Sequence, residues 1–275
     1  MWQTFKEERN EMLLEVKNLS IVFAADKRKE KVEATKDISF SIKEREVVAI
    51  VGESGCGKSI LCRSLVGILP TTAEVISGEI LYKGKELRTC SKKQLQNIRG
   101  GEIAMVWQDP VSFFQPSISV GKQVIEGLKY HRKMRRKERE ELGVSLMEKV
   151  GIENAYARFH NYPYEFSGGM LQRCAIASAI SCEPSLLIAD EPTTALDSAT
   201  QWEILELLKR LKEEKHMAIL LVTHDLSVAE HMADTIVVMN HGRIVEAGTK
   251  EAIFSQPMHQ KTKELLEAMP ENWRD

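Results

Sequence analysis

The sequence VGESGCGKSI, residues 51–60, places three glycines and a lysine between the apolar run EVVAI and the apolar, helix-like LCRSLVGIL. It fits the pattern G-x-x-x-x-G-K-[ST] in the strand–loop–helix context that this motif requires. Glycines let the backbone curl so that successive N–H groups point inward and form a nest for an anion. The start of the following helix adds a partial positive charge. The stretch therefore predicts a loop that binds a nucleoside triphosphate.

The chemistry of this loop depends on a lysine and a hydroxyl group at its end. Lys58 can reach the β- and γ-phosphates, and the Ser59 hydroxyl can bind Mg²⁺. We expect the nucleotide to contact the whole loop, which consists of Gly52, Glu53, Ser54, Gly55, Cys56, Gly57, Lys58, Ser59 and Ile60. The alternative is a glycine-rich turn with a surface lysine.

The composition excludes several classes of protein. The 275 residues include 38 Lys and Arg and 40 Asp and Glu, which gives a net charge of −2. The chain therefore has no overall positive charge that would attract nucleic acid. No apolar run approaches the ~18 residues that span a bilayer, and the charged start MWQTFKEERNEM lacks the apolar stretch of a secretory signal. Five cysteines include no C-x-x-C pair, which favours free thiols over disulfides or a zinc site. We expect a soluble, intracellular protein that reaches a membrane only through a partner.

Strand and helix patterns alternate along most of the chain. LLEVKNLSIVF and EATKDISFSI alternate apolar and polar residues as β-strands do, and the apolar runs at 46–51, LLIAD and AILLV indicate buried parallel strands. One helix is expected from 58 to 69 and another over SATQWEILELLKRLKEEK. From about 119 to 182 the period is helical, and HRKMRRKEREELGVSLMEKV indicates a solvated helix, with a docking patch at 132–139 as the alternative. This order predicts an α/β core with a helical insert.

A pair of carboxylates follows one of the buried strands. SLLIADEPTTALD places Asp190 and Glu191 at the carboxyl end of that strand, where ligands of open parallel sheets bind. Asp190 can hold Mg²⁺ through its water shell, and Glu191 can act as general base on the attacking water. The alternative is a solvated pair that caps a turn before Pro192.

A third motif carries a resemblance to a known family. FSGGMLQRCAIASAI, residues 166–180, resembles the signature segment of ATP-binding cassette (ABC) proteins, whose usual core is L-S-G-G-Q. Ser167, Gly168 and Gly169 would form a second helix start suited to phosphate, with Met170 in place of the usual glutamine. The resemblance implies that the signature of one subunit closes over the γ-phosphate held by another subunit's loop. A plain helix cap is the alternative.

Four further residues resemble landmarks of the same family, in the same order. The resemblance implies that Gln108 senses Mg²⁺ and the attacking water, and that the switch histidine His224 contacts the γ-phosphate. It also implies that Asp197, in a D-loop, crosses the dimer interface and that Phe23 stacks on adenine. Taken alone, His224 suits a structural role and Phe23 a core position.

The resemblance runs from about 13 to 270 and implies a fold and a division of the chain. The fold is α/β, a P-loop NTPase core of mostly parallel sheet flanked by helices, with an N-terminal antiparallel β subdomain and a helical ABC insert. Within a single ATPase domain of residues 1–275, we expect the core at 12–110 and 184–250. The helical subdomain is expected at 115–183 and a helical tail at 251–275.

The motifs look most similar to the oligopeptide/dipeptide/nickel importer class. This implies an ATP-hydrolysing subunit, using ATP and Mg²⁺, at the cytoplasmic face of the cell membrane. Integral permease subunits would hold it there beside a second ATPase subunit, different or identical, and a solute-binding protein would act indirectly. Leu171, in place of a basic residue, and the absence of cysteine after Cys182 favour nickel or a metal chelate over peptides.

Two alternatives come from other classes. One is a soluble ABC-type ATPase acting on nucleic acid or as a regulator, which the near-neutral charge disfavours, so we expect no nucleic acid partner. The other is a P-loop phosphotransferase, in which the S-G-G segment would have no role.

Overall fold

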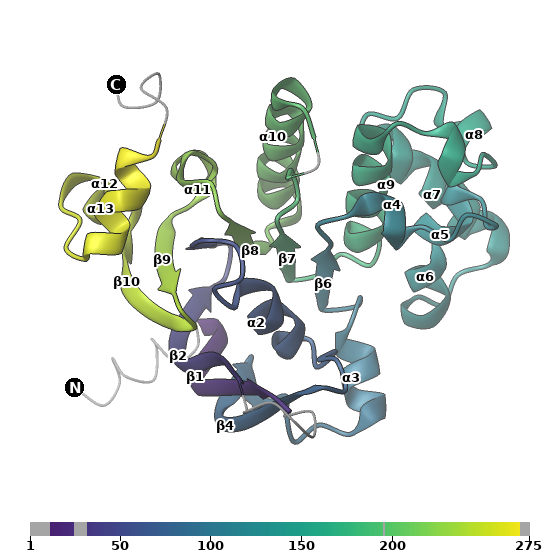
Figure 1. Ribbon diagram of the computed structural model, residues 1–275. Helices are drawn as coiled ribbons and strands as arrows, with labels where there is room; N and C mark the ends of the chain where they lie inside the picture. The colour runs from purple at the N-terminus through teal and green to yellow at the C-terminus, as the bar shows by residue number, and fades with distance from the viewer. Residues whose placement is uncertain (1–11, 25–31, 195, 270–275) are drawn as a thin grey trace. The chain divides into compact units, whose positions relative to one another are not determined.

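The computed structural model describes residues 12–24, 32–194 and 196–269 (Figure 1). The chain divides into two compact units. The first unit comprises Met1–Leu95 and Ala218–Asp275, and the second comprises Gln96–Met217. The first eleven residues of the charged start and the end of the expected tail lie outside the described residues. The subdomain limits expected from the sequence stay predictions.

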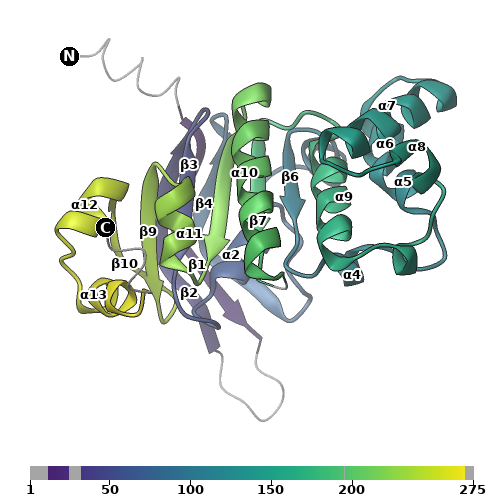
Figure 2. The ribbon, with the colours of Figure 1, turned by 90° about the horizontal axis from the view of Figure 1, so that it is seen from above.

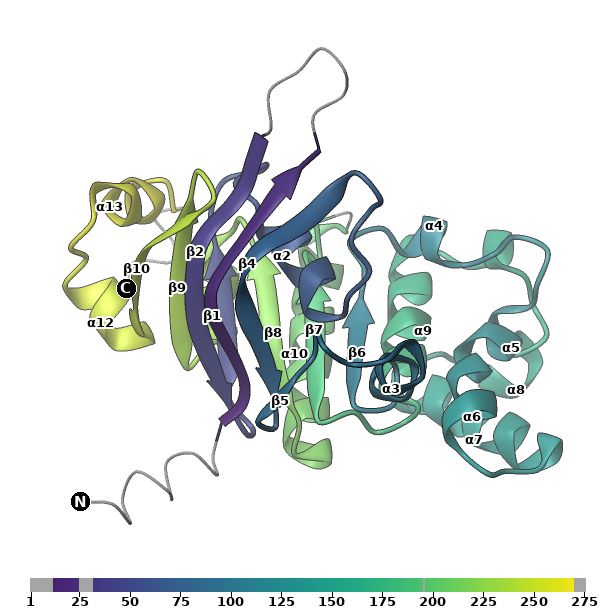
Figure 3. The ribbon, with the colours of Figure 1, turned by 90° about the horizontal axis from the view of Figure 1, so that it is seen from below.

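The first unit begins with an antiparallel sheet. Its order is β2-β1-β4-β5, and Figure 3 shows the three long strands side by side. The strands are β1 (Met12–Phe23), β2 (Val32–Lys43), β4 (Ala73–Tyr82) and β5 (Lys85–Glu86). Val16 pairs with Phe40 on one side and Ile80 on the other. Burial along β1 does not alternate as its sequence predicts, because residues 19–22 are buried in succession. The expected antiparallel β subdomain is confirmed.

A second sheet in the first unit carries the phosphate loop. Its strands here have the order β10-β9-β3-β8, with β3 parallel to β8 and β9, and β10 antiparallel to β9. They are β3 (Val47–Val51), β8 (Ala218–Thr223), β9 (Thr235–Asn240) and β10 (Arg243–Thr249). Every residue of β3 and β8 is buried, as the continuous apolar runs predict.

Four helices accompany these strands within the first unit. They are α2 (Lys58–Leu65), α11 (Leu226–Met232), α12 (Lys250–Ser255) and α13 (Gln260–Glu267). Helix α11 packs on β3 and β8, and Figure 2 shows it lying against the sheet. Helices α12 and α13 follow β10 directly and stay beside it in Figure 1. Helix α3 (Lys92–Ile98) runs from the first unit into the second.

The second unit is mainly helical. It contains two parallel strands, β6 (Ile103–Val106) and β7 (Leu186–Asp190). Its helices are α4 (Pro110–Phe113), α5 (Val120–Val124), α6 (Glu126–His131), α7 (Arg136–Lys149), α8 (Ala155–Arg158), the 3₁₀ turn η1 (Pro163–Glu165), α9 (Gly168–Ile180) and α10 (Ser198–Lys215). The helical period predicted from about 119 to 182 is therefore confirmed.

Phe159 anchors the packing of these helices. Its side chain is 2% exposed, and a Cβ on Gly121 of α5 or Gly143 of α7 would collide with its ring. The two glycines therefore leave the space that the ring fills, which brings α5 and α7 close together.

Two helices differ from their predicted lengths. Helix α2 ends at Leu65, not 69, and Gly67 follows in the left-handed region with a φ of 64°. The solvated helix expected over HRKMRRKEREELGVSLMEKV is broken between α6 and α7, because the backbone of Arg132 is extended, with φ −128° and ψ 133°. The Arg132 guanidinium donates to the Cys182 carbonyl at 2.8 Å. A new helix, α7, begins at Arg136, where the Glu138 side chain accepts from the Arg135 N–H at 2.8 Å.

Among the described residues, no helix combines the length and apolar character needed to cross a bilayer.

Candidate functional site

The phosphate loop joins β3 to α2 in the first unit. Gly55 and Gly57 have φ values of 81° and 105°, in the left-handed region that glycine tolerates best. A Cβ on Gly57 would also collide with the carbonyl oxygen of Ala34. The glycine pattern is therefore required by the path of the backbone itself.

Lys58 lies inside this loop. The residue is only 4% exposed. Its Nζ donates to the carbonyl oxygens of Gly52 at 2.7 Å and Glu53 at 2.9 Å. A buried ammonium group needs such partners to offset its lost hydration. Burial raises the pKa of the neighbouring Cys56 thiol, an effect that the Lys58 charge opposes. The loop thus concentrates positive charge beside a neutral thiol.

The start of α2 adds to this character. Its N-cap residue, Gly57, offers no side-chain acceptor, so no side-chain cap bond reaches the N–H groups of the first turn. A helix start of this kind, next to a buried lysine, has the donor set that a triphosphate requires. The residues present therefore fit the predicted nucleotide.

Glu191 and Gln108 meet in the second unit. Strands β6 and β7 are parallel neighbours, so the residues that follow them emerge at the same edge. Gln108 Nε2 donates to Glu191 Oε2 at 3.1 Å, and Thr194 Oγ1 donates to the same oxygen at 2.9 Å. Glu191 is 8% exposed and has a φ of 47°, a strained value for a non-glycine residue. Asp190, at the end of β7, is 3% exposed. The structure thus brings the predicted base and the predicted Q-loop glutamine into contact.

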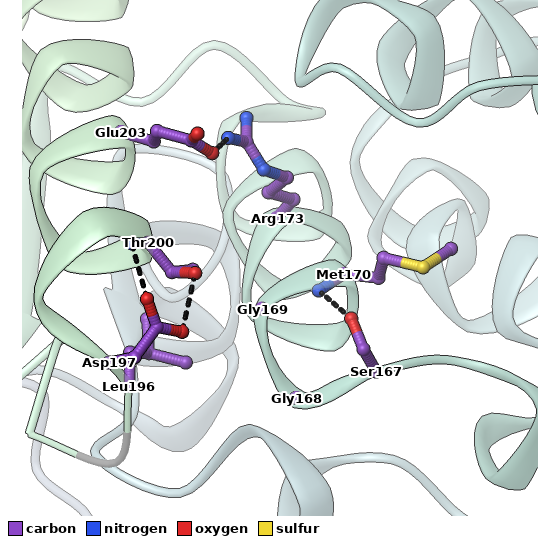
Figure 4. Close-up of a pocket in the computed structure, with 9 residues that line it drawn as sticks. All are labelled: Ser167, Gly168, Gly169, Met170, Arg173, Leu196, Asp197, Thr200 and Glu203. Atoms are coloured by element: carbon purple, nitrogen blue, oxygen red, sulfur yellow. Dashed lines mark hydrogen bonds and ion pairs between the residues drawn. The ribbon is translucent and has the colours of Figure 1, made fainter.

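The signature segment lines a pocket of about 360 Å³ in the second unit (Figure 4). Its walls are Ser167, Gly168, Gly169, Met170, Arg173, Leu196, Asp197, Thr200 and Glu203. The Ser167 hydroxyl accepts from the Met170 N–H at 3.3 Å and so caps α9. A Cβ on Gly169 would lie 2.7 Å from Thr200 Cγ2, whereas one on Gly168 would have nothing within 4 Å. The signature and the D-loop residue Asp197 therefore share one cavity.

Two pairs of residues in the walls of this pocket are joined by hydrogen bonds, Arg173 with Glu203 and Asp197 with Thr200, as Figure 4 shows. Arg173 Nη2 donates to Glu203 Oε2 at 2.6 Å, and its Nη1 donates to the Val150 carbonyl at 2.8 Å. Asp197 caps α10 by accepting from the Thr200 N–H at 3.0 Å and from the Thr200 hydroxyl at 2.7 Å. The first arginine contact joins α9 to α10, so the two helix starts face the cavity together.

Two predicted residues lie in the first unit with Lys58. His224 is exposed and follows β8, just before Asp225 caps α11 through the Ser227 N–H at 2.8 Å. Phe23 is half-buried at the end of β1, paired with Val32 and Ala73. The roles expected for both residues stay predictions. The other predicted residues beyond the loop, namely Gln108, Ser167, Gly168, Gly169, Met170, Asp190, Glu191 and Asp197, all lie in the second unit.

A comparison with protein families decides the identity of this arrangement. The family model described as ABC transporter matches residues 35–194, more than half of the chain. The chain belongs to the ABC transporter family. It is accordingly an ATP-binding cassette with ATPase activity, and the expected P-loop NTPase fold is confirmed.

Known ABC proteins resemble the chain over most of its length. The dipeptide transport ATP-binding protein DppD of Bacillus subtilis (strain 168) is 44% identical over 94% of this chain and 77% of the relative. The oligopeptide transport ATP-binding protein OppD of the same strain is also 44% identical, over 94% of this chain and 72% of the relative. A dimeric, post-hydrolysis structure of the ATP-binding cassette MJ0796 bound to ADP and Pi covers 86% of this chain and 98% of its own, at 28% identity and a TM-score of 0.77.

Two residues of this ABC cassette that touch the site were missed in the sequence. Thr194, inside the quoted SLLIADEPTTALD, helps to hold the Glu191 carboxylate. Gln172 is 1% exposed, and its Nε2 donates to the Pro192 carbonyl at 2.7 Å, which ties the signature helix to the turn after Glu191. Gln172 is a polar residue on the otherwise apolar face of the helix LQRCAIASAI. This pattern could have indicated a buried side chain that needs a hydrogen-bond partner.

Proposed function

We propose that this ABC ATPase is the ATP-hydrolysing subunit of an importer for small peptides. The observation that carries the proposal is the Glu191 carboxylate, buried at the end of β7 and held by Gln108 and Thr194. A buried, doubly oriented carboxylate at a strand end suits a general base. The relatives named above, which transport dipeptides and oligopeptides, support the choice of solute.

The proposed site divides the chemistry among a few side chains. Lys58 and the N–H groups at the start of α2 bind the triphosphate, and Glu191 takes a proton from the attacking water. His224, which directly follows β8, contacts the γ-phosphate in this proposal. Gln108 and Thr194 orient the base, because both donate to the same oxygen of its carboxylate.

The proposed cofactor is Mg²⁺, held by Ser59, Gln108 and Asp190. The described residues contain no group of three or more His, Cys, Asp or Glu side chains that could hold a metal ion. A hydroxyl, an amide and a carboxylate suit a Mg²⁺ ion that keeps waters and phosphate oxygens as its other ligands. Such an ion supplies charge neutralisation to the transferred phosphoryl group.

We propose that a second ATPase subunit completes each site. Ser167 and Gly168 are exposed beside the signature pocket, and Gly168 has open space where a side chain would be. The dimeric arrangement of the related MJ0796 cassette supports this role. The partner is a different ATPase chain or a second copy, and its bound ATP meets the signature across the interface.

A set of exposed apolar side chains in the second unit is proposed to bind the permease subunits. They lie in or after α4, which packs on α9, and in or just before η1, which leads into α9. They are Val111 (60% exposed), Phe113, Ile118, Tyr162 and Tyr164 (77% exposed), and the two tyrosine rings stack with centroids 5.8 Å apart. Exposed aromatic groups of this kind mark interaction surfaces. This contact would place the protein at the cytoplasmic face of the membrane, without insertion.

The proposed solute follows from the relatives more than from the chain. Leu171, which favoured nickel or a metal chelate, is 3% exposed in α9. Its apolar character is therefore explained by packing within the cassette, and it gives no evidence about the solute.

Uptake in cells tests the whole proposal. A strain that lacks this chain should lose uptake of a radiolabelled dipeptide, and a plasmid with the wild-type chain should restore it. The Glu191→Gln variant should restore nothing, because its amide cannot accept a proton from water. Unchanged dipeptide uptake with lost nickel uptake would overturn the peptide assignment while keeping the importer.

A further inference from the structure

The C-terminal helix α13 contacts the phosphate loop. Lys261 Nζ forms an ion pair with the carboxylate of Glu53, the second residue of the loop, 208 positions away in sequence. The same ammonium group lies 3.2 Å from Glu264 Oε2, one turn further along α13. The Lys261 side chain is only 15% exposed, whereas that of Glu53 is 60% exposed. The largely buried lysine thus holds the exposed side chain of a residue in the phosphate loop.

The position of Lys261 is itself fixed. Glu246 on β10 accepts hydrogen bonds from the Met258 N–H at 2.8 Å and the His259 N–H at 2.9 Å. His259 Nδ1 accepts from the Lys261 N–H at 3.0 Å and so caps α13. Thr262 is fully buried beside it. These contacts hold the first turn of α13 on the sheet, so the ion pair joins the loop to an ordered helix.

The contact continues to the lysine of the phosphate loop. The main-chain oxygen of Glu53 accepts from Lys58 Nζ at 2.9 Å. A shift of Glu53 would therefore move one of the carbonyl oxygens that accept hydrogen bonds from Lys58. The hydrogen bond to Lys261 lowers the pKa of Glu53 and raises that of Lys261, so both groups stay charged near neutral pH.

We propose that Lys261 is a positioning residue for ATP: its ion pair with Glu53 holds the phosphate loop in the conformation that receives the triphosphate. The proposal rests on the proposed ATP site at residues 52–59. Nothing in this contact involves Glu191, so its loss affects nucleotide binding and leaves the chemical step unchanged. Exposed ion pairs are weak, so we expect Lys261→Met to raise Kd and KM for ATP about two- to fivefold with kcat unchanged.

The test titrates a fluorescent ATP analogue and measures steady-state hydrolysis with the full chain. Lys261→Arg should bind like wild type, because arginine can also pair with Glu53. Two matched controls on α13 should also bind like wild type: Lys263→Met removes an exposed charge, and Glu264→Gln removes the other partner of Lys261. Glu53→Gln breaks the pair without touching α13. Its effect and that of Lys261→Met should not add in the double variant.

Lys58→Ala separates the two proposals. Nucleotide binding equal to wild type in Lys58→Ala would overturn the site assignment and, with it, the role of Lys261. Lost binding in Lys58→Ala with wild-type Kd and KM in Lys261→Met and Glu53→Gln would overturn the role of Lys261 alone. A fall in kcat or melting temperature in Lys261→Met that Glu53→Gln does not share would mean that Lys261 acts only in folding α13.

Discussion

The phosphate loop and the signature segment both place glycines ahead of a helix, but these glycines have different surroundings. In the loop, a Cβ on Gly52 or Gly57 would collide with carbonyl oxygens of the chain itself, those of Met239 and Ala34. In the signature, a Cβ on Gly168 would meet nothing within 4 Å. The loop is closed around its own lysine, whereas the signature faces an open pocket.

This difference separates two reasons for a glycine. At Gly57 the backbone conformation and a neighbouring carbonyl exclude any other residue, so the single chain explains the choice. At Gly168 the single chain imposes no such limit within its described residues. An open space beside an exposed helix start suits close approach by another molecule, which fits the proposed nucleotide of a partner subunit.

Removal of the loop lysine should have the largest effect. Lys58→Ala deletes the buried charge that two carbonyl oxygens hold, and we expect ATP hydrolysis to fall by about 100-fold or more. Phosphate release by the purified chain measures this, with circular dichroism as the control for folding. Hydrolysis near the wild-type rate would show that the closed loop is not the nucleotide site.

The next variant replaces the proposed general base, Glu191. It tests ATP binding by the phosphate loop and dimer formation through the signature segment in one experiment. Glu191→Gln keeps the shape of the side chain but removes the proton acceptor, so kcat should fall about 10²-fold while ATP still binds. We expect ATP to accumulate on this variant and to shift its mass in solution from monomer to dimer, measured by light scattering.

The dimer measurement has a clear control and a clear failure. Glu191→Gln combined with Lys58→Ala should stay monomeric, because ATP can no longer bind. An unchanged hydrolysis rate in Glu191→Gln would remove this carboxylate from the mechanism. A monomer that binds ATP would show that a different ATPase chain must supply the partner.

Paired glycine variants test the comparison directly. Gly168→Ala adds a Cβ to open space, so the melting temperature should stay within about 2 °C of wild type. Hydrolysis and ATP-dependent association should nevertheless fall about tenfold or more, because the partner's nucleotide needs that space. Gly169→Ala is the matched contrast, since its Cβ would lie 2.7 Å from Thr200 Cγ2 and should lower the melting temperature of the single chain. Wild-type association and hydrolysis in Gly168→Ala would contradict the proposed role of the pocket.

The parts of this molecule that the sequence predicts are those set by neighbouring residues. The buried run of β3, the positive φ of Gly55 in the loop and the cap of α9 by Ser167 all depend on positions within a few residues of one another. The Lys261–Glu53 ion pair and the Arg132–Cys182 hydrogen bond join positions 208 and 50 residues apart. The periodicity of a local segment carries no information about such distant contacts. The second contact lies at Arg132, where the helix predicted from the charge pattern is interrupted.

The smallest effect concerns the cap that supports the open pocket. Two hydrogen bonds lower the pKa of Asp197 below its ordinary value of 3.8. The bond from the Thr200 N–H has the larger effect and that from the Thr200 hydroxyl the smaller one. The ionised carboxylate is therefore the form that stabilises the start of α10, and its contribution is present above pH 3.8 and lost as pH falls through the lowered value. We expect Asp197→Ala to lower the urea midpoint slightly and equally at pH 7 and pH 5, with the difference from wild type shrinking below about pH 4. Asp197→Asn keeps an oxygen acceptor for the Thr200 N–H without the charge. At pH 7 its urea midpoint should therefore lie between those of wild type and Asp197→Ala, and its difference from Asp197→Ala should change little with pH. A difference between wild type and Asp197→Ala that stays constant at the lowest pH would mean that the oxygen atom alone, and not its charge, holds α10 beside the signature.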